Sequence, residues 1–488
     1  MLPYAPLLLF LIPFMAALVC AVLAWFSIRL TRYVMLASLT ANAGVALFLA
    51  SHTMGGQTIR DNMGGWPPPI GIELMVDSIG AIMAVVVALI SLITVGGSLP
   101  IFRRDFNERD AFSYPCMLLL ISGLMGMIVT HDLFNMFVHL EVVSLCAYCL
   151  VAAGGRGAPG AAMKYLILGS LGASTYLLGV GFIYAATGSL NMSDVAQHLS
   201  DGYPKLVLVG TGLIAVGLAV KMGLFPLHSW MPAAYSLSPT TSASLMAPLV
   251  TKVSAYALLR ILYWVYGWDS FTDETIVSQM LCWAGAAAVV VGGLLAFQQD
   301  DFRRLLAYSS VSQMGIIAIG IGLADSNAFT GAVLQIINDA VMKCLLFMSA
   351  AMILLQFEIR NVSDLWRLRG RAPWTSAAIT VTGFSLIGLP PFCGFFGKWY
   401  VLAGAMEGER WGLAAAIVIG SLATAAYVFR ILEQLYFKEQ DKTEHSTEGP
   451  WSLVVAVVLL AVAVVAIGLG SERIVTTLIQ PVLLGGAS

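Results

Sequence analysis

A lysine, a histidine and two prolines stand in one apolar stretch, residues 219–232, AVKMGLFPLHSWMP. Pro226 has no backbone donor and clashes with the preceding turn, so a membrane-spanning helix should break or kink there. Backbone groups that are freed at that depth need protein or a water-filled cavity as partners. Lys221 precedes this proline and His228 follows it. An ionisable group beside a broken helix is a known way to build an ion site at the membrane midplane.

Five further charged residues also lie inside apolar runs: Glu141, Lys252, Asp339, Lys343 and Lys398. A charge at the centre of a membrane helix costs about 2.5–3.5 kcal/mol on insertion scales. Such groups persist when they pair inside a bundle, usually because something crosses the membrane there. One buried pair has a purely structural explanation, but four lysines on four helices favour a path for protons or cations.

Several of these polar residues allow two interpretations. Asp339 and Lys343 are four residues apart, on one face of a helix. They form either a local neutralising pair or a site in which Asp339 tunes Lys343 or takes part in a cation path. His139 serves either packing and hydrogen bonding or proton transfer. His228 suits a proton relay beside the break, because imidazole titrates near neutral pH.

The composition is that of a membrane protein. Hydrophobic residues make up 59% of the 488 positions and charged residues only 11%, and the mean hydropathy is +0.86. Ordinary soluble domains carry about 25% charged residues. The net charge of −2 gives no case for nucleic-acid binding. Cys146 and Cys149 form a CxxC within an apolar helix, where small packing residues are expected in place of a metal or redox site.

An enzyme with its own cofactor is the rival class of function. A membrane redox protein that binds haem or quinone would need paired ligands, such as histidines on facing helices. His131 and His139 lie on one predicted helix, and the other histidines are scattered. No glycine-rich nucleotide loop is present either. We therefore expect no cofactor, no metal and no catalytic chemistry of the chain's own. A structural subunit without transport is a further alternative.

Fourteen apolar spans are expected, which predicts an all-α polytopic membrane protein. Their centres lie near residues 15, 42, 88, 121, 143, 174, 217, 253, 286, 312, 343, 388, 424 and 460. The first is expected to be a retained span, because no basic residue precedes it and no convincing cleavage site follows it. Residues 55–72 are too polar and too rich in Gly and Pro to span, so a turn or hairpin is expected there.

Basic residues predict the orientation of these spans. Connections after odd-numbered spans carry sixteen Lys and Arg residues, and connections after even-numbered spans carry three. Because Lys and Arg favour the cytoplasmic side, both termini are expected outside. Arg260 lies near a span end, where its long side chain can reach the interface. The sixteen are Arg29, Arg32, Arg103, Arg104, Arg109, Arg156, Lys164, Arg303, Arg304, Arg360, Arg367, Arg369, Arg371, Arg430, Lys438 and Lys442; the three are Arg60, Lys205 and Arg410.

Two spans share an unusual composition. Residues 386–402, LIGLPPFCGFFGKWYVL, combine a proline break, glycines, aromatics and one lysine, as the stretch around Pro226 does. The two breaks are five spans apart, so their helices run in opposite directions. This pattern indicates an inverted repeat of spans 4–8 and 9–13, with spans 7 and 12 broken. The expected divisions are residues 1–110, 111–268, 274–438 and 451–488.

Several blocks of the chain resemble one family. The antiporter-like subunits of Mrp-type multisubunit Na+/H+ antiporters, of respiratory complex I and of membrane-bound hydrogenases carry similar sequences. The resemblance extends from about residue 75 to 437 and is closest to the D subunit of the Mrp type. It implies fourteen helices with the same inverted repeat. The blocks are residues 131–148 (HDLFNMFVHLEVVSLCAY), 164–199, 221–260 (KMGLFPLHSWMPAAYSLSPTTSASLMAPLVTKVSAYALLR), 303–322 (RRLLAYSSVSQMGIIAIGIG) and 388–400.

The resemblance implies a path for protons. Glu141 would pair with Lys221 and set its charge, and Lys252 would be the next relay. Lys343 and Lys398 would carry the path through the second half. The chain would then be a proton-translocating subunit of a Na+/H+ antiporter in a bacterial inner membrane. Its partners would be other membrane subunits, protons and lipid, with sodium as a further candidate. The alternative is the same role in a complex driven by redox chemistry in partner subunits.

The chain departs from the family's pattern in span eleven. Many relatives carry histidines there, in a pattern such as HxxNHxxxK. Residues 335–343 here read QIINDAVMK, so Gln335 and Asp339 stand in the histidine positions. The family's usual chemistry in this span is therefore replaced by a carboxylate and an amide.

Overall fold

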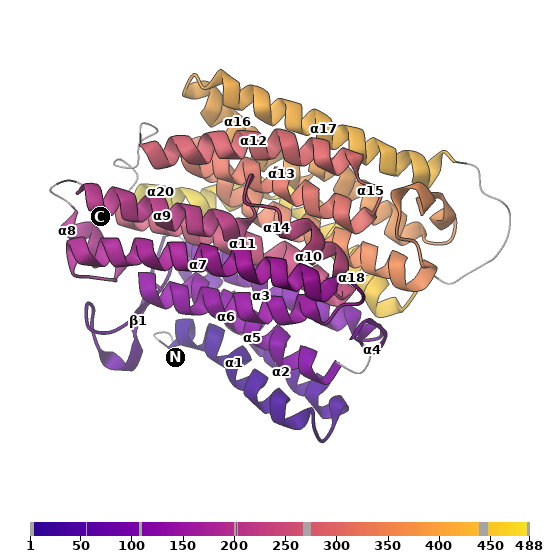
Figure 1. The fold of residues 1–488 in the computed structure, drawn as a ribbon, viewed down its shortest axis with the longest axis horizontal. Helices are drawn as coiled ribbons and strands as arrows, with labels where there is room; N and C mark the ends of the chain where they lie inside the picture. The colour runs from indigo at the N-terminus through magenta and orange to yellow at the C-terminus, as the bar shows by residue number, and fades with distance from the viewer. Residues whose placement is uncertain are drawn as a thin grey trace.

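The chain folds into a bundle of long helices that run side by side (Figure 1). It is described by a computed structural model covering residues 4–54, 56–106, 110–199, 202, 204–266, 275–438 and 448–485. Within these ranges, thirteen helices are long and apolar enough to cross a membrane. The expected fourteenth crossing consists of two helices of 15 residues each, α15 and α16. The all-α polytopic fold is thus confirmed, with span twelve divided.

The elements before the first repeat and in that repeat are α1 (Ala5–Leu23), α2 (Ile28–Thr53), β1 (Ile59–Asn62), η1 (Met63–Gly65), β2 (Glu73–Val76), α3 (Ser78–Ser98), α4 (Phe102–Phe106), α5 (Asp110–Val129), α6 (Leu133–Ala152), α7 (Ala158–Thr187), α8 (Met192–His198), α9 (Lys205–Met222), α10 (Met231–Leu237) and α11 (Thr240–Tyr266). Those of the second repeat and the C-terminal part are α12 (Ile276–Gln298), α13 (Phe302–Gly322), α14 (Ser326–Phe357), η3 (Val362–Leu368), α15 (Pro373–Ile387), α16 (Cys393–Glu407), α17 (Trp411–Tyr436), α18 (Trp451–Leu469), α19 (Ser471–Ile474), η4 (Val475–Ile479) and α20 (Gln480–Gly485). The boundary expected between the repeats, residues 268–274, lies outside the described residues.

The segment that was too polar to span forms a small hairpin. Strands β1 and β2 pair antiparallel, with Ile59 opposite Val76 and Asn62 opposite Glu73. Asp77 follows β2 and caps α3 by accepting a hydrogen bond from the Gly80 amide at 2.6 Å. The predicted hairpin therefore exists and leads directly into the third span.

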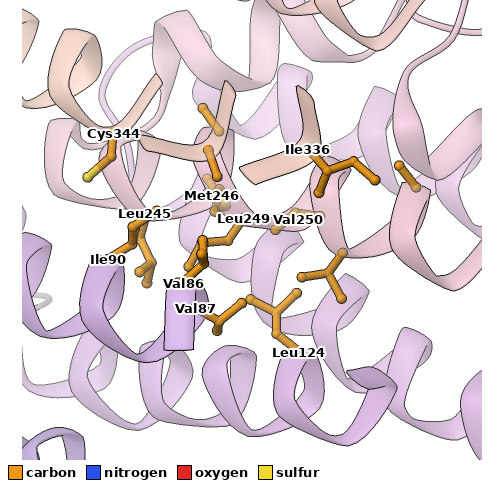
Figure 2. Packing of buried hydrophobic residues seen from close by; sticks show 14 of the residues in the cluster. Val86, Val87, Ile90, Leu124, Leu245, Met246, Leu249, Val250, Ile336 and Cys344 are labelled. Atoms are coloured by element: carbon orange, nitrogen blue, oxygen red, sulfur yellow. The ribbon is translucent and has the colours of Figure 1, made fainter. Parts of the chain in front are cut away.

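Helices α11, α13 and α14 form the centre of the bundle. Most residues of their apolar windows are buried, whereas only about a third of the residues in the α1 and α2 windows are. In Figure 2, Leu249 and Val250 of α11 lie among Val87 of α3, Leu124 of α5 and Ile336 of α14. The charged residues of α11 and α14 are thus held inside protein, away from the lipid-facing surface.

Both predicted breaks are present and are built alike. Helix α9 ends at Met222 with Gly223 at φ 67°, and α15 ends at Ile387 with Gly388 at φ 93°. A cis X–Pro bond stands three residues after each glycine, at Pro226 and Pro391. Both backbones follow one hydrogen-bond pattern: Leu224 N donates to Ala219 O and Leu227 N to Leu224 O at the first break, and Leu389 N donates to Phe384 O and Phe392 N to Leu389 O at the second. The sequences GLFP and GLPP are therefore two copies of one turn.

Matching contacts at the helix starts support the inverted repeat. Asp132 caps α6 and pairs with Asn191, and Asp301 caps α13 and pairs with Asn361. The backbone bonds match as well: Leu133 N to Leu190 O and Met192 N to His131 O in one half, Phe302 N to Arg360 O and Val362 N to Asp300 O in the other. Five spans separate the two sites, so they lie at opposite ends of the bundle.

Two buried arginines tie elements together. Arg303 of α13 donates to the carbonyls of Tyr235 and Ser238, both at 2.7 Å, which joins the second repeat to α10 of the first. Arg260 is 2% exposed and donates to the carbonyl oxygens of Ile128 and Met75. The expectation that Arg260 reaches the interface was wrong, because its two terminal guanidinium nitrogens bond carbonyls at the ends of α5 and β2 inside the protein.

Candidate functional site

The first charged pair joins α6 to the end of α9. Lys221 Nζ lies 3.4 Å from Glu141 Oε1, 2.7 Å from Ser144 Oγ and 3.5 Å from the Tyr148 hydroxyl. The lysine side chain is 4% exposed and the glutamate 28%. The pairing implied by the family resemblance is therefore present. The serine is nevertheless the nearer acceptor, so the lysine is shared between a neutral and a charged partner.

The second charged pair crosses between the two repeats. Lys252 Nζ of α11 lies 2.6 Å from Asp339 Oδ2 of α14, and neither side chain is exposed. Lys252 also donates to the Ala247 carbonyl at 3.1 Å. The spacing of Asp339 and Lys343 allowed a local pair, but the ion pairs of the described residues include none between them. The structure thus corrects that interpretation: packing of α11 against α14 gives Asp339 a partner from the other repeat.

The remaining two lysines are bound by neutral oxygens. Lys343 donates to Ser309 Oγ and to the Leu306 carbonyl of α13. Lys398 of α16 donates to the Leu386 and Ile387 carbonyls, at 2.5 and 3.1 Å, at the end of α15. Both lysines are buried. When Lys343 or Lys398 is protonated, its ammonium therefore has only neutral hydrogen-bond acceptors among the described residues.

Helix breaks explain where two of the lysines lie. The last carbonyls of a helix have no partner within it and carry the negative end of the helix dipole. Lys221 belongs to the last turn of α9, and Lys398 reaches back across the second break to the last turn of α15. Lys398 thus brings its ammonium to the carboxyl end of a half-helix, whereas Lys221 bonds across to Glu141 and Ser144 of α6.

Lys398 also lines a pocket. A cavity of about 290 Å³ lies between α16 and α17 and is bordered by Ile387, Phe395, Lys398, Val418 and Ser421 among others. Ser421 Oγ lies 3.4 Å from the lysine Nζ. The last lysine of the series therefore adjoins open space, whereas Lys252 and Lys343 are enclosed.

The two histidines stand apart from the lysines. His228 is half-buried between the rings of Phe225 and Tyr308, with centroids 5.4 and 6.2 Å away. No hydrogen bond or ion pair of the described part of the chain joins it to a relay lysine. The His139 ring packs edge-on against Phe10 at 5.2 Å. The relay role of His228 therefore stays a prediction. His139 makes a packing contact with the Phe10 ring.

Polar side chains of α13 and α14 extend the site. Gln335 donates to Gln313 Oε1 at 2.7 Å, and Asn338 donates to the Cys393 carbonyl at the start of α16, also at 2.7 Å. Gln335 Oε1, Gln313 Nε2, Asn338 Oδ1 and Asp339 Oδ1 are buried without a hydrogen-bond partner among the described residues. Buried polar atoms of this kind are normally satisfied by ordered water. These amides therefore place polar atoms between Asp339 and the second broken helix.

The sequence interpretation missed four of the polar residues that complete the site. Ser144 and Tyr148 follow Glu141 at the helical spacings i+3 and i+7, which is a signal that was available. Ser309 and Ser421 carry no such signal. They are neighbours of Lys343 and Lys398 only because α13 and α17 pack against the helices of those lysines.

Comparison with known proteins decides the family. A family model described as NADH:quinone oxidoreductase/Mrp antiporter, TM, matches residues 130–424. The chain is 39% identical over 493 residues to NADH-quinone oxidoreductase subunit N of Desulforudis audaxviator, covering 98% of each chain. The chain belongs to this family. It is therefore an antiporter-like membrane subunit, and not an enzyme with its own active site.

Two further relatives show the family's breadth. A putative antiporter subunit mnhD2 of Staphylococcus aureus is 30% identical over 466 residues, covering 94% of this chain and 92% of the relative. A chain of the membrane-bound sulfane sulfur reductase, an archaeal respiratory membrane complex, is 31% identical with a TM-score of 0.89, covering 99% of this chain and 97% of that chain. Family members thus occur in complexes named for antiport and in complexes named for redox chemistry.

Proposed function

We propose that this chain translocates protons within a larger membrane complex through its buried lysines and carboxylates. The observation that carries the proposal is the set of four buried lysines with two carboxylates, spread over both repeats and ending beside a pocket. Charged groups inside a membrane bundle mark ion or proton paths. Its partners are other membrane subunits, as those of its relatives are.

The proposed order of transfer follows the pairs. Glu141 and Lys221 form the entry switch, because the lysine can move between the carboxylate and Ser144. Lys252 is the next relay, followed by Lys343 and Lys398 in the second repeat. His228 lies at the first break, where an imidazole can exchange protons near neutral pH. No metal or cofactor is needed for this sequence of transfers.

The driving reaction has two candidates. Na+/H+ exchange in an Mrp-type complex is supported by the similarity to the putative antiporter subunit mnhD2. Redox-driven pumping is supported by the higher identity to NADH-quinone oxidoreductase subunit N and by the sulfane sulfur reductase chain. Both use this subunit for the same task, and the partner subunits supply the driving force. In either setting we propose a bacterial inner membrane as its location.

Transport in everted vesicles that carry the whole complex tests the proposal. We expect Glu141→Ala and Lys221→Ala each to abolish proton movement, because the entry switch loses one partner. Assembly is checked on a native gel. Wild-type transport by both variants in an intact complex would overturn the proposal. Proton movement that requires a Na+ gradient identifies antiport, whereas movement that requires a reductant identifies redox-driven pumping.

A further inference from the structure

The ion pair between Lys252 and Asp339 is the most enclosed charged contact of the described residues. Its partners come from α11 and α14, one from each repeat, and both side chains are completely buried. Their backbones lie in the two helices that form the centre of the bundle. A purely structural role is a weak explanation, because replacing a buried ion pair with apolar residues is often neutral or stabilising.

Asp339 has a second lysine within its own helix. Lys343 follows one turn later on the same face of α14, where residues four apart are neighbours. In the described state Lys343 is held by Ser309 and the Leu306 carbonyl of α13 instead. The Asp339 carboxylate therefore has two lysines as neighbours, Lys252 and Lys343. In the described state it pairs with Lys252.

The carboxylate is free to change partner. Asp339 Oδ1 has no hydrogen-bond donor among the described residues, and Oδ2 has only the Lys252 ammonium. A carboxylate that is fixed structurally usually accepts several hydrogen bonds, as Asp325 does from two backbone amides at the start of α14. Asp339 is thus tied to the protein by a single contact that rotation of its side chain can break.

The surroundings offer a route for the proton. Asn338 precedes Asp339 and reaches the first residue of α16, beyond the second break. Its Oδ1 and the unpaired amide atoms of Gln335 and Gln313 suit ordered water. These polar atoms of α13 and α14 therefore lead from Asp339 toward the second broken helix, and Lys343 itself lies one helical turn from Asp339.

We propose that Asp339 is a partner-switching carboxylate that links proton transfer in the two repeats. Paired with Lys252, it stabilises the proton on the first-repeat lysine. When it turns to Lys343, the Lys252 ammonium loses its partner and gives up its proton, and Lys343 gains one. One proton leaves Lys252 and one arrives at Lys343, so the charge of the set is conserved. This inference rests on the proposed function.

Four variants test the switch in the same everted vesicles of the whole complex. We expect Asp339→Asn and Lys343→Met each to lower transport about a hundredfold or more, the scale of losing a proton-transfer group. Asp339→Glu should retain transport, because it keeps the carboxylate. The double variant Lys252→Met/Asp339→Leu should assemble but not transport. Glu358→Gln is the matched control, since Glu358 caps the same helix and is exposed.

The outcomes separate the switch from a structural pair. If the double variant transports at the wild-type rate, the pair is structural and the inference fails. Wild-type transport by Lys343→Met also overturns the inference. Because Lys343→Met leaves the Lys252–Asp339 pair intact, it tests the switch even if Asp339→Asn does not assemble. Loss of transport in Lys221→Ala together with normal transport in Asp339→Asn rejects the switch alone. Normal transport in Lys221→Ala and Glu141→Ala rejects the proposed function itself.

Discussion

At the residue scale, the chemistry of each lysine is set by the oxygen atoms around its ammonium. Lys221 and Lys252 have a carboxylate within 3.4 and 2.6 Å, whereas Lys398 has the carbonyls of a helix end. A buried ammonium without such partners would be costly. The four sites therefore stabilise an ammonium in two ways, with a carboxylate in the first repeat's lysines and with neutral oxygens in the second repeat's lysines.

The competition between Ser144 and Glu141 gives a residue-scale prediction. Ser144→Ala removes the acceptor that lies 2.7 Å from Lys221, so the lysine should remain on Glu141. We expect transport to fall about fivefold, the rate equivalent of a hydrogen bond of roughly 1 kcal/mol. Transport in everted vesicles is the measurement. Ser254→Ala is the control, because Ser254 is buried and its side chain bonds Val250 O of its own helix and no other group among the described residues. Equal rates in the two variants would contradict the prediction.

At the element scale, the same broken-helix structure occurs once in each of the two repeats. Each broken helix has a left-handed glycine at its break and continues through a cis X–Pro bond. Lys221 lies in the last turn of α9, and Lys398 bonds the carbonyls that end α15. Glycine adopts a positive φ without the steric cost that other residues have. The break therefore depends on Gly223 and Gly388 as much as on the prolines that were evident in the sequence.

Replacement of the second glycine tests this dependence. Gly388→Ala places a Cβ at φ 93°, about 3.2 Å from Lys398 Cδ. We expect a loss of stability of about 1–2 kcal/mol from the left-handed backbone, together with slower transport because Lys398 is displaced. A thermal shift of the purified complex and vesicle transport measure the two effects. Gly181→Ala of α7 is the control, since nothing lies within 4 Å of its added Cβ. An unchanged melting temperature for Gly388→Ala would refute the expectation.

At the scale of the whole molecule, the two repeats are joined by polar contacts across their interface. Arg303 binds the carbonyls that end α10, and Lys252 meets Asp339 between α11 and α14. The hairpin β1–β2 and α8 lie at one end of the bundle, and α4 lies at the other (Figure 1). The distribution of basic residues predicts that the end with α4 faces the cytoplasm.

Thiol labelling checks this orientation. Gln57 precedes the hairpin and Gly155 follows α6, and both are exposed. With a membrane-impermeant thiol reagent, we expect Gln57→Cys to be labelled in right-side-out vesicles and Gly155→Cys only in everted ones. The exposed native Cys149 is accounted for by labelling the unaltered chain in parallel. The reverse pattern would invert the predicted topology and the direction of the proposed path.

The sequence by itself determined which helices carry charge and where they break. Lysines in apolar runs are rare enough to stand out, and Pro226 and Pro391 have local consequences for the backbone that no tertiary context is needed to predict. The two breaks are an odd number of spans apart, which likewise indicated an inverted repeat. These features are local, or they depend only on the number of crossings.

Only the tertiary structure decided which groups meet. Asp339 pairs with Lys252, 87 residues earlier in the chain, and not with the lysine one turn away. Arg260 turns inward to carbonyls of Ile128 and Met75 although it lies near a span end. The physical reason is that a buried charge takes the partner that helix packing brings within reach, and packing depends on contacts between distant segments.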